Sequence, residues 1–312
     1  MDAYQGISSL AKALGVSQKA LYSASNSLHR HYHAVKIPKA NGEYRRLYVP
    51  DEFLKHLQRR INERLLSQEE ISPYATAYRN GGGIVVNAKP HVGQKMILKL
   101  DIRKFFDHLL YPIVKRKVFP AAKYSEDTRI LLSLLCIYMD AIPQGAPTSP
   151  TISNIIMRDF DDTVGSWCWK RGISYTRYCD DMTFSGDFEA QEVIAFVRAE
   201  LWKMGLFLNG KKTVVVREGQ RHTVTGILVN EKLSVSKEYK KKIRQEMYYC
   251  MKYGVCSHME KNSNSEAESS YIRKLLGRVN YVLSVETDNS TMKEYKNWLQ
   301  KCLLNTRRKV YE

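Results

Sequence analysis

The stretch Ser174-Tyr-Thr-Arg-Tyr-Cys-Asp-Asp-Met-Thr-Phe-Ser185 decides the fold, because it sets two adjacent carboxylates in an apolar run that favours β-structure. Asp180 and Asp181 are costly in such a run unless a cation neutralises them. A hairpin turn would hold them at the solvent-facing end of a sheet, where carboxylate oxygens are placed to bind Mg²⁺. A plain Asp-Asp turn is the alternative for these residues taken alone.

A third carboxylate favours the metal site. Asp101 lies near the end of a second apolar run, Met96 to Ile102, which we interpret as a buried strand. Three carboxylates from two neighbouring strands can hold two metal ions about 3.5–4 Å apart, the arrangement used for in-line nucleotidyl transfer. We interpret another acidic group, Asp159, Asp161 and Asp162, as a solvated helix face.

Composition limits the partners and the compartment. The chain has 312 residues, 49 Lys and Arg against 32 Asp and Glu, and a formal net charge of +17. This charge predicts a polyanionic partner, with nucleic acid ahead of a membrane surface. The longest apolar stretch, Ile130 to Met139, is too short to span a bilayer, and no secretory signal is visible. Six cysteines without a CxxC pair fit reduced thiols. We therefore expect a cytoplasmic protein, not a secreted, membrane-spanning or disulfide-stapled one.

Local patterns predict several further elements. Asn41-Gly42 between two β-prone runs, 34–38 and 44–49, indicates a hairpin. The residues from Ser9 to Leu21 have helix-turn-helix spacing, which we interpret as two packing helices in preference to a DNA-reading module. Val224 to Val229 is expected to be a strand, and three helices are expected after Ser234, over 237–253, 271–285 and 291–306.

Six motifs occur in the order found in reverse transcriptases, and the chain resembles the bacterial retron branch of that family over about residues 37–230. Cys179 stands where these enzymes usually carry Ala, and residues 79–83 depart from their usual glycine pattern. The motifs are Asp101-Ile-Arg-Lys-Phe-Phe106, Pro143-Gln-Gly-Ala-Pro-Thr-Ser-Pro150, Tyr178-Cys-Asp-Asp181, Leu208-Asn-Gly-Lys-Lys-Thr213, Asn87-Ala-Lys-Pro-His91 and Val224-Thr-Gly226.

The resemblance implies an α+β fold, a right-hand polymerase with fingers and palm made of antiparallel sheet plus helices and with a helical thumb. The implied divisions are N-terminal helices over 1–34, fingers over 35–95, palm with part of the fingers over 96–235, and thumb over 236–312.

The resemblance also implies residue roles. Two Mg²⁺ ions would be held by Asp101, Ile102, Asp180 and Asp181, and the three carboxylates would be catalytic. Phe106 would pack under the nucleotide sugar and exclude a ribose 2′-OH, unless it is an ordinary core aromatic. Gln144 and Gly145 would lie beside the incoming nucleotide. Arg45 would bind its triphosphate, and Lys39 or Arg46 could share that task. Lys212, together with Lys211, would neutralise phosphate or the carboxylates.

The remaining candidates concern RNA. For Asn87 and His91 we favour a structural or RNA-contacting role over catalysis, and Val224, Thr225 and Gly226 complete the family signature. Basic residues interleaved with tyrosines after residue 236 suit RNA, and Tyr248 or Tyr249 could receive unstacked bases unless they pack between helices. We interpret His29, His31 and His33 as solvated or RNA-facing, and Cys250, Cys256 and His258 as too loosely spaced for zinc.

Together these features predict an RNA-directed DNA polymerase that copies part of its own structured noncoding RNA into a branched RNA–DNA hybrid (msDNA) from deoxynucleoside triphosphates. The resemblance implies a role in anti-phage defence with an effector protein encoded nearby, and RNA removal by a host RNase H. The alternatives are a catalytically idle RNA-binding scaffold for an effector, and a reverse transcriptase of the group II intron or diversity-generating type.

Overall fold

The computed structural model describes residues 6–38, 42–261 and 265–308. The chain divides into two compact units, each built from two segments of sequence. The first comprises residues 1–83 and 96–215, and the second comprises residues 84–95 and 216–312. The predicted division into fingers, palm and thumb remains a prediction. The two compact units have different boundaries from those predicted divisions, because residues 84–95 group with the C-terminal part of the chain.

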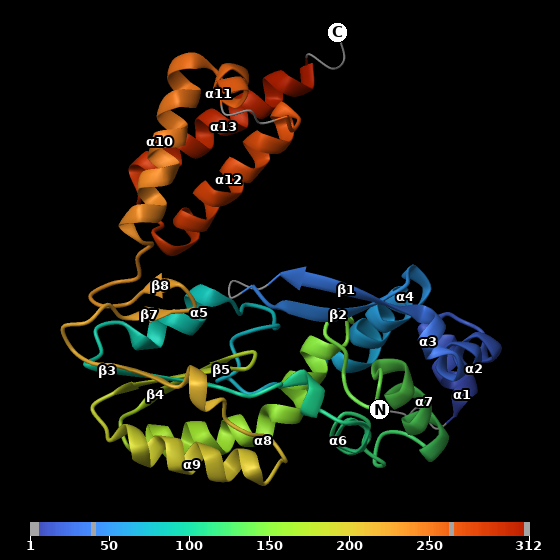
Figure 1. Cartoon of the computed structure of the whole chain (residues 1–312). Helices are drawn as coiled ribbons and strands as arrows, with labels where there is room; N and C mark the ends of the chain where they lie inside the picture. Colours follow the sequence, from blue (N-terminus) through green and yellow to red (C-terminus); the bar gives the residue numbers. More distant parts are fainter. Residues whose placement is uncertain (1–5, 39–41, 262–264, 309–312) are drawn as a thin grey trace. The chain divides into compact units, whose positions relative to one another are not determined.

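The first unit is organised around a four-stranded sheet with the strand order β4-β5-β3-β6. Strand β5 pairs antiparallel with β3 on one side and with β4 on the other. Helices α8 and α9 cover one face of this sheet (Figure 1). The bounds are β3 Met96–Asp101, β4 Ser174–Tyr178, β5 Asp181–Gly186, β6 Val214–Val216, α8 Ser149–Trp169 and α9 Ala190–Trp202.

The predicted hairpin in residues 34–49 is present as strands β1 and β2, which pair antiparallel from Tyr32↔Pro50 to Pro38↔Tyr44. Gly42 follows Asn41 with a φ of 82°, and Asn41 itself lies outside the described residues. Strand β2 leads into α4, whose N-cap Asp51 accepts a hydrogen bond from the Leu54 amide. These elements are β1 Tyr32–Pro38, β2 Tyr44–Pro50 and α4 Glu52–Ile61, which continues as one π-helical turn over Asn62–Leu66.

The N-terminal helices pack on the rest of the first unit, as expected. Gly15 ends α1 in the left-handed conformation, and the Ser17 side chain caps α2. Helix α1 packs against α4 and α7, and α2 packs against α7, with Leu10, Leu14 and Leu21 fully buried. The remaining helices of this unit are α1 Ile7–Leu14, α2 Gln18–Asn26, α3 Leu28–His31, α6 Tyr111–Lys117, α7 Glu126–Cys136 and the 3₁₀ turns Phe106–His108 and Gly210–Lys212.

The second unit consists of a small β-hairpin with α5 and a group of four helices, α10 to α13 (Figure 1). Glu286 joins two of these helices, accepting hydrogen bonds from Lys240 Nζ at 2.6 Å and from the Val235 amide at 2.9 Å. Its elements are α5 Ile84–Ala88, the 3₁₀ turn Lys89–His91, β7 Thr223–Val224, β8 Ile227–Leu228, α10 Lys237–Tyr253, α11 Val255–Lys261, α12 Glu268–Val285 and α13 Ser290–Arg308.

One predicted strand is wrong. Val224 to Val229 does not extend as a single strand, because Thr225 and Gly226 both adopt positive φ, at 46° and 84°. Two consecutive positive φ values are typical of a tight two-residue hairpin turn. The segment therefore folds back on itself, with Val224 paired to Ile227.

Across the described part of the chain, no helix is both long and apolar enough to cross a lipid bilayer. All six cysteines lie in the described residues and are free thiols.

Candidate active site

The β4–β5 hairpin carries the adjacent carboxylates at its tip. Tyr178 pairs with Asp181, so that Cys179 and Asp180 form a two-residue turn. Cys179 has a φ of 62°, in the left-handed region that such turns use. This conformation costs about 1–2 kcal/mol for a residue with a Cβ. The turn is therefore held by contacts around it and is not a product of local preference.

Strand pairing brings the third carboxylate to the same place. In the β3–β5 register, Asp101 lies directly opposite Asp181. The Ile102 amide donates a hydrogen bond of 3.0 Å to the Asp180 carbonyl, which ties the end of β3 to the turn. Asp101 is buried, Asp180 is half-buried and Asp181 is exposed, so the group faces solvent from the edge of the sheet.

The Asp101 carboxylate already has two partners within the first unit. Lys212 Nζ lies 2.5 Å from Asp101 Oδ2, and Asn209 Nδ2 donates to Oδ1 at 3.0 Å. The Asn209 amide also donates to the Asp101 carbonyl at 2.8 Å. This contact agrees with the predicted role of Lys212 in neutralising the site carboxylates. Asn209 was not predicted to act, although it belongs to the same motif.

Burial and neighbouring carboxylates act together on Asp181. Withdrawal from water by the surrounding protein, and then the negative charges of Asp180 and Asp101, raise the pKa of Asp181 to about 6. Lys212 acts in the opposite direction on Asp181. The hydrogen bond to Asp101 raises the pKa of Lys212 itself. Negative charge in excess of the local positive charge is what a bound cation would relieve.

The donor set fits a divalent cation by its chemistry, since carboxylate oxygens are the ligands that Mg²⁺ prefers. The fit is incomplete in arrangement. Among the described residues, no three acidic, histidine or cysteine side chains converge on one ion position. The Lys212 ammonium is the cation in contact with Asp101, and it would have to give way to a metal ion.

The predicted nucleotide loop packs on the hairpin of β1 and β2. The Tyr48 amide donates to the Gln144 carbonyl at 2.9 Å. Gly145 has a φ of 120°, and a Cβ there would lie 2.8 Å from the Tyr48 carbonyl oxygen. Only glycine fits this close approach. The glycine was predicted to allow an approach by the nucleotide; the contact seen is with the protein backbone.

The other predicted nucleotide-binding residues lie in the same unit. Phe106 is half-buried and meets Phe105 edge-on, with ring centroids 5.4 Å apart. Arg45 and Arg46 are both exposed on β2, opposite Ile37 and Lys36. Lys39 lies outside the described residues. Both interpretations of Phe106, sugar contact and core aromatic, agree with its position.

The two retron signatures meet in the second unit. Asn87 Nδ2 donates to Thr225 Oγ1 at 3.5 Å, and that hydroxyl donates to the Ile84 carbonyl at 3.2 Å. Asn87 is 1% exposed and Val224 is fully buried. The contact between α5 and the β7–β8 turn brings Asn87 and Thr225 together, although they are 138 positions apart in the sequence.

His91 is also fully buried in this unit, and Gly226 is exposed at the turn. Burial lowers the pKa of His91 to about 4, so its ring is neutral at physiological pH. Of the two roles predicted for Asn87 and His91, burial supports the structural one.

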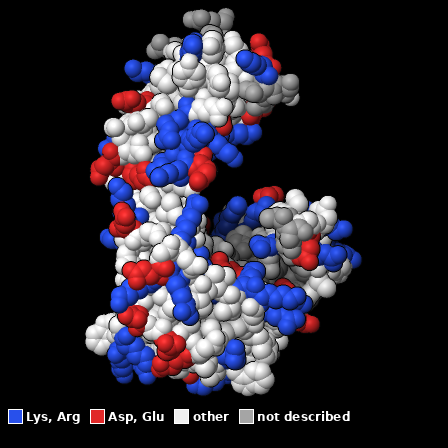
Figure 2. Space-filling model, turned by 60° about the vertical axis from the view of Figure 1, so that its left-hand side comes forward, with Lys and Arg blue, Asp and Glu red and all other residues white. Residues whose placement is uncertain are grey.

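Helix α10 presents a basic and aromatic surface. Its six Lys and Arg outnumber its two Glu, and Figure 2 shows Lys and Arg side chains gathered on the helices of this unit. Tyr248 is 54% exposed, with Lys252 Nζ 5.4 Å from its ring centroid. Tyr249 is 36% exposed and stacks on His258 of α11, with centroids 5.6 Å apart and planes 8° apart. Tyr248 is therefore the more available ring.

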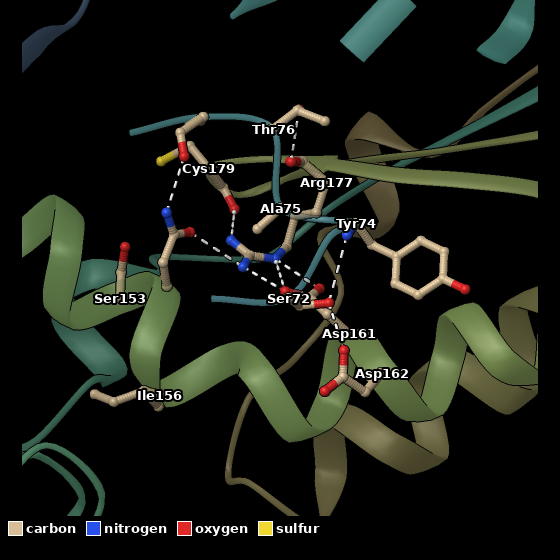
Figure 3. Close-up of polar contacts among 12 residues, drawn as sticks. Ser72, Tyr74, Ala75, Thr76, Ser153, Ile156, Asp161, Asp162, Arg177 and Cys179 are labelled. Atoms are coloured by element: carbon tan, nitrogen blue, oxygen red, sulfur yellow. Dashed lines mark hydrogen bonds and ion pairs between the residues drawn. The ribbon is translucent and has the colours of Figure 1, made fainter. Parts of the chain in front are cut away.

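One sequence interpretation needs correction. Asp161 is not part of a solvated helix face, because it is fully buried and ion-paired with Arg177 beneath the sheet (Figure 3). A sequence signal did exist: Asp161 follows Met157 by four positions and precedes Val164 by three, all on the buried stripe of α8. The other two carboxylates of the group, Asp159 and Asp162, pair with Lys117 and Ser72.

A smaller correction concerns His31. Its Nδ1 lies 2.7 Å from Asp51 Oδ2, so this histidine has an acidic partner that the local sequence does not reveal. The β1–β2 pairing brings the two residues together, and the Asp51 amide also donates to the His31 carbonyl at 2.7 Å.

Comparison with known proteins identifies the family. The reverse transcriptase (RNA-dependent DNA polymerase) family matches residues 37–244. The chain is 34% identical to the retron Mx65 reverse transcriptase of Myxococcus xanthus over 77% of its own length, and 32% identical to the retron Ec83 reverse transcriptase of Escherichia coli over 74%. It belongs to the retron reverse transcriptases.

This retron reverse transcriptase also resembles the retron Ec86 reverse transcriptase of Escherichia coli, with 29% identity over 89% of the chain. It spans 61% of the Mx65 protein, 84% of the Ec86 protein and 79% of the Ec83 protein. Family membership and the mixture of helices with antiparallel sheet confirm the predicted α+β polymerase fold.

Two solved structures give weaker likenesses. Apo telomerase from Candida tropicalis aligns with a TM-score of 0.48 and 12% identity, over 87% of this chain and 57% of that one. A foamy viral protease–reverse transcriptase in complex with double-stranded DNA aligns with a TM-score of 0.45 and 16% identity, over 88% and 43%.

Proposed function

We propose that the protein is a retron-type RNA-directed DNA polymerase that copies part of its own structured noncoding RNA into a branched RNA–DNA hybrid (msDNA). The observation that carries the proposal is the β3–β5 register, which sets Asp101 opposite Asp181 with Asp180 at the adjoining turn. The order of the sequence motifs and the family membership support the same activity.

In this proposal two Mg²⁺ ions would be held by the carboxylates of Asp101, Asp180 and Asp181. Ile102 has an apolar side chain, so its predicted part falls to its backbone carbonyl. The ions, when bound, activate the primer hydroxyl and stabilise the charge on the triphosphate and leaving pyrophosphate. Without metal, the Lys212 ammonium is paired with the Asp101 carboxylate. When a metal ion takes that place, Lys212 would bind phosphate oxygens instead, because an ammonium on a flexible side chain can pair with either group.

Selection of the nucleotide is assigned to the first unit. Phe106 would lie under the sugar and exclude a ribose, while the exposed Arg45 would donate to the triphosphate. Gln144 and Gly145 shape the loop beside the nucleotide, and that loop is fixed to the β2 backbone through Tyr48. In this proposal Phe106 limits the space under the sugar, and the contact with β2 holds the neighbouring loop in place.

Binding of the cognate RNA is assigned to the second unit, which we equate in part with the predicted thumb. Basic side chains on α10 would attract phosphates without regard to sequence. Tyr248 and Tyr249 would stack on unpaired bases of the folded RNA, which gives selectivity by shape. Retron membership further supports a place in anti-phage defence, with an effector protein encoded nearby and a host RNase H that removes copied RNA.

The decisive test is to purify the full chain from cells that carry its native locus and to sequence the nucleic acid that copurifies. The matched control is the Asp180→Asn protein, purified in parallel. We expect RNA joined to DNA on the wild-type protein, and RNA without DNA on the variant. RNA alone on both proteins would support the idle scaffold, and DNA on both would remove the carboxylates from the reaction. DNA copied from a mobile intron or a variable repeat would support the other reverse transcriptase types.

A further inference from the structure

A fully buried ion pair lies under the strand that leads to the catalytic turn. Arg177 of β4 and Asp161 of α8 both have side chains 0% exposed. The guanidinium contacts the carboxylate three times, with Nη2 at 2.5 Å from Oδ2 and Nε at 2.8 Å from Oδ1 and 3.0 Å from Oδ2. Tyr175 OH donates to the same Oδ1 at 2.8 Å. These contacts fix the orientation of the guanidinium through its Nε–Nη2 edge, and the Tyr175 hydroxyl holds the carboxylate in place.

Stability alone does not account for such a pair. Taking two charges out of water costs several kcal/mol each, and apolar residues of similar volume often serve a core as well or better. The pair does provide direction, because a guanidinium is planar and presents its donors in a rigid fork. Because three contacts with Asp161 fix the guanidinium, its remaining N–H donors can reach acceptors at only two positions.

The first of these places is the catalytic turn itself. Arg177 Nη1 donates to the Cys179 carbonyl at 2.9 Å. Cys179 is the turn residue with a φ of 62°, and its carbonyl belongs to the peptide that leads into Asp180. The buried guanidinium therefore holds the Cys179–Asp180 peptide in place (Figure 3). The orientation of this peptide sets the direction of the Asp180 carboxylate.

The second place is Asn154 of α8, which links the turn to a neighbouring segment. Arg177 Nη2 donates to Asn154 Oδ1 at 3.2 Å, and Asn154 Nδ2 donates to the Ala77 carbonyl at 2.8 Å. The next residue, Tyr78, also has positive φ, at 57°. The contacts of Arg177 therefore reach the Cys179 carbonyl directly and, through Asn154, the peptide that precedes Tyr78.

We propose that Arg177 and Asp161 are positioning residues for the reaction, which hold the Cys179–Asp180 turn in the strained form that directs the catalytic carboxylates. The inference rests on the proposed polymerase function, which supplies the reaction. The conformation of the turn, however, can be measured without any reaction.

Two variants test the proposal. Arg177→Lys keeps a positive charge beside Asp161, but a single ammonium cannot reach both Asp161 and the Cys179 carbonyl in the same way. Arg177→Met combined with Asp161→Leu leaves no unpaired buried charge, so the fold is retained while the donor to the turn is lost. Deoxynucleotide incorporation on a generic primer–template gives kcat, KM and the Mg²⁺ concentration for half-maximal rate. Amide hydrogen exchange over residues 174–186 reports the hairpin directly.

We expect both variants to lose at least tenfold in kcat, with KM for the deoxynucleotide changed less than twofold and the half-maximal Mg²⁺ concentration raised severalfold. Exchange in the hairpin should become at least tenfold faster. Lys117→Met combined with Asp159→Leu is the matched control, because it removes an ion pair between α6 and α8 that does not contact the turn. That control should leave all four quantities unchanged.

A folded double variant with wild-type kcat and wild-type exchange would overturn the proposal, and so would an equal loss of activity in the control. Failure of the proposed function is recognisable separately. In that case the wild-type protein makes no DNA, and the exchange comparison alone decides whether Arg177 holds the turn.

Discussion

The two units of the chain use charge in opposite ways. In the first unit, Arg177 and Asp161 are fully buried and form an ion pair, and Arg177 also donates a hydrogen bond to the adjacent turn. In the second unit, Lys241 and Arg244 stand exposed on α10, on the same side as Tyr248 by helical spacing. A buried charge fixes geometry at short range, whereas an exposed charge attracts a polyanion at long range and is weakened by salt. Catalysis should depend on the first kind and RNA affinity on the second.

The largest effect is expected for Asp181→Asn, which breaks the short-range side of this comparison. We expect DNA synthesis to fall by roughly a thousandfold or more, because charge stabilisation at the reacting phosphate is lost. Affinity for RNA should stay within twofold, since the substitution lies in the other unit. Primer extension and filter binding on one preparation measure both. Near-normal synthesis would contradict the metal assignment.

The next effect concerns the rings of α10. Tyr248→Ala should lower affinity for the cognate RNA by about 1–3 kcal/mol, the cost of one lost base–ring stack, with the melting temperature unchanged. Tyr249→Ala should lower both quantities, because this ring also stacks on His258. Extension of a generic primer–template should continue in each variant. A fall in melting temperature for Tyr248→Ala would assign that ring to helix packing.

His91 is a buried titratable group in the second unit, the unit whose exposed charges are expected to bind RNA. Because it is buried, we expect it to affect the stability of the fold and not the affinity for RNA. The pKa of His91 is about 4 in the folded protein and near 6.5 when unfolded, so the unfolded chain binds a proton first as pH falls. Its contribution to stability is complete above pH 6.5 and is lost between pH 6.5 and 4.

By this linkage His91 should lower the free energy of unfolding by about 2 kcal/mol between pH 7 and pH 5. Urea unfolding at both pH values, followed by circular dichroism, measures the loss. His91→Gln should reduce the pH dependence by that amount. An unchanged pH dependence in the variant would show that another group titrates.

The smallest effect per residue is expected on the exposed side. Lys241→Gln with Arg244→Gln should reduce the slope of log affinity against log salt by roughly two units, one for each lost phosphate contact. Lys203→Gln, an exposed lysine of the first unit, is the control and should leave the slope unchanged. Equal changes in both proteins would mean that net charge, and not the α10 surface, attracts the RNA.

Sequence patterns located the carboxylates well, because a strand end and a hairpin tip are local features. They predicted Asp101, Asp180 and Asp181 as one group, and the β3–β5 register agrees. They could not supply what surrounds the group. Arg177 lies in a strand whose inner residues are all buried, so alternation does not mark its side. Its partner is 16 positions away on a helix, and only the tertiary fold brings the two together.

Backbone conformation set the other limit. The Val224–Val229 run has the composition of a strand, yet Thr225 takes a positive φ that β-branched residues rarely adopt. The hydrogen bond from its hydroxyl to the Ile84 carbonyl stabilises that conformation from a distant part of the chain. In the same way, the grouping of residues 84–95 with the C-terminal helices has no local signal.

The β3–β5 register has a consequence for how the gene can change. Side chains alternate between the two faces of a strand, so the loss of one codon within 96–100 would turn Asp101 to the opposite face while leaving every site residue in the protein. Frame-preserving single-codon deletions should therefore be purged within 96–101 and 181–186. In the exposed turn around Gly219 they should persist, because no carboxylate depends on its register. Length, as much as identity, is under selection in these two strands.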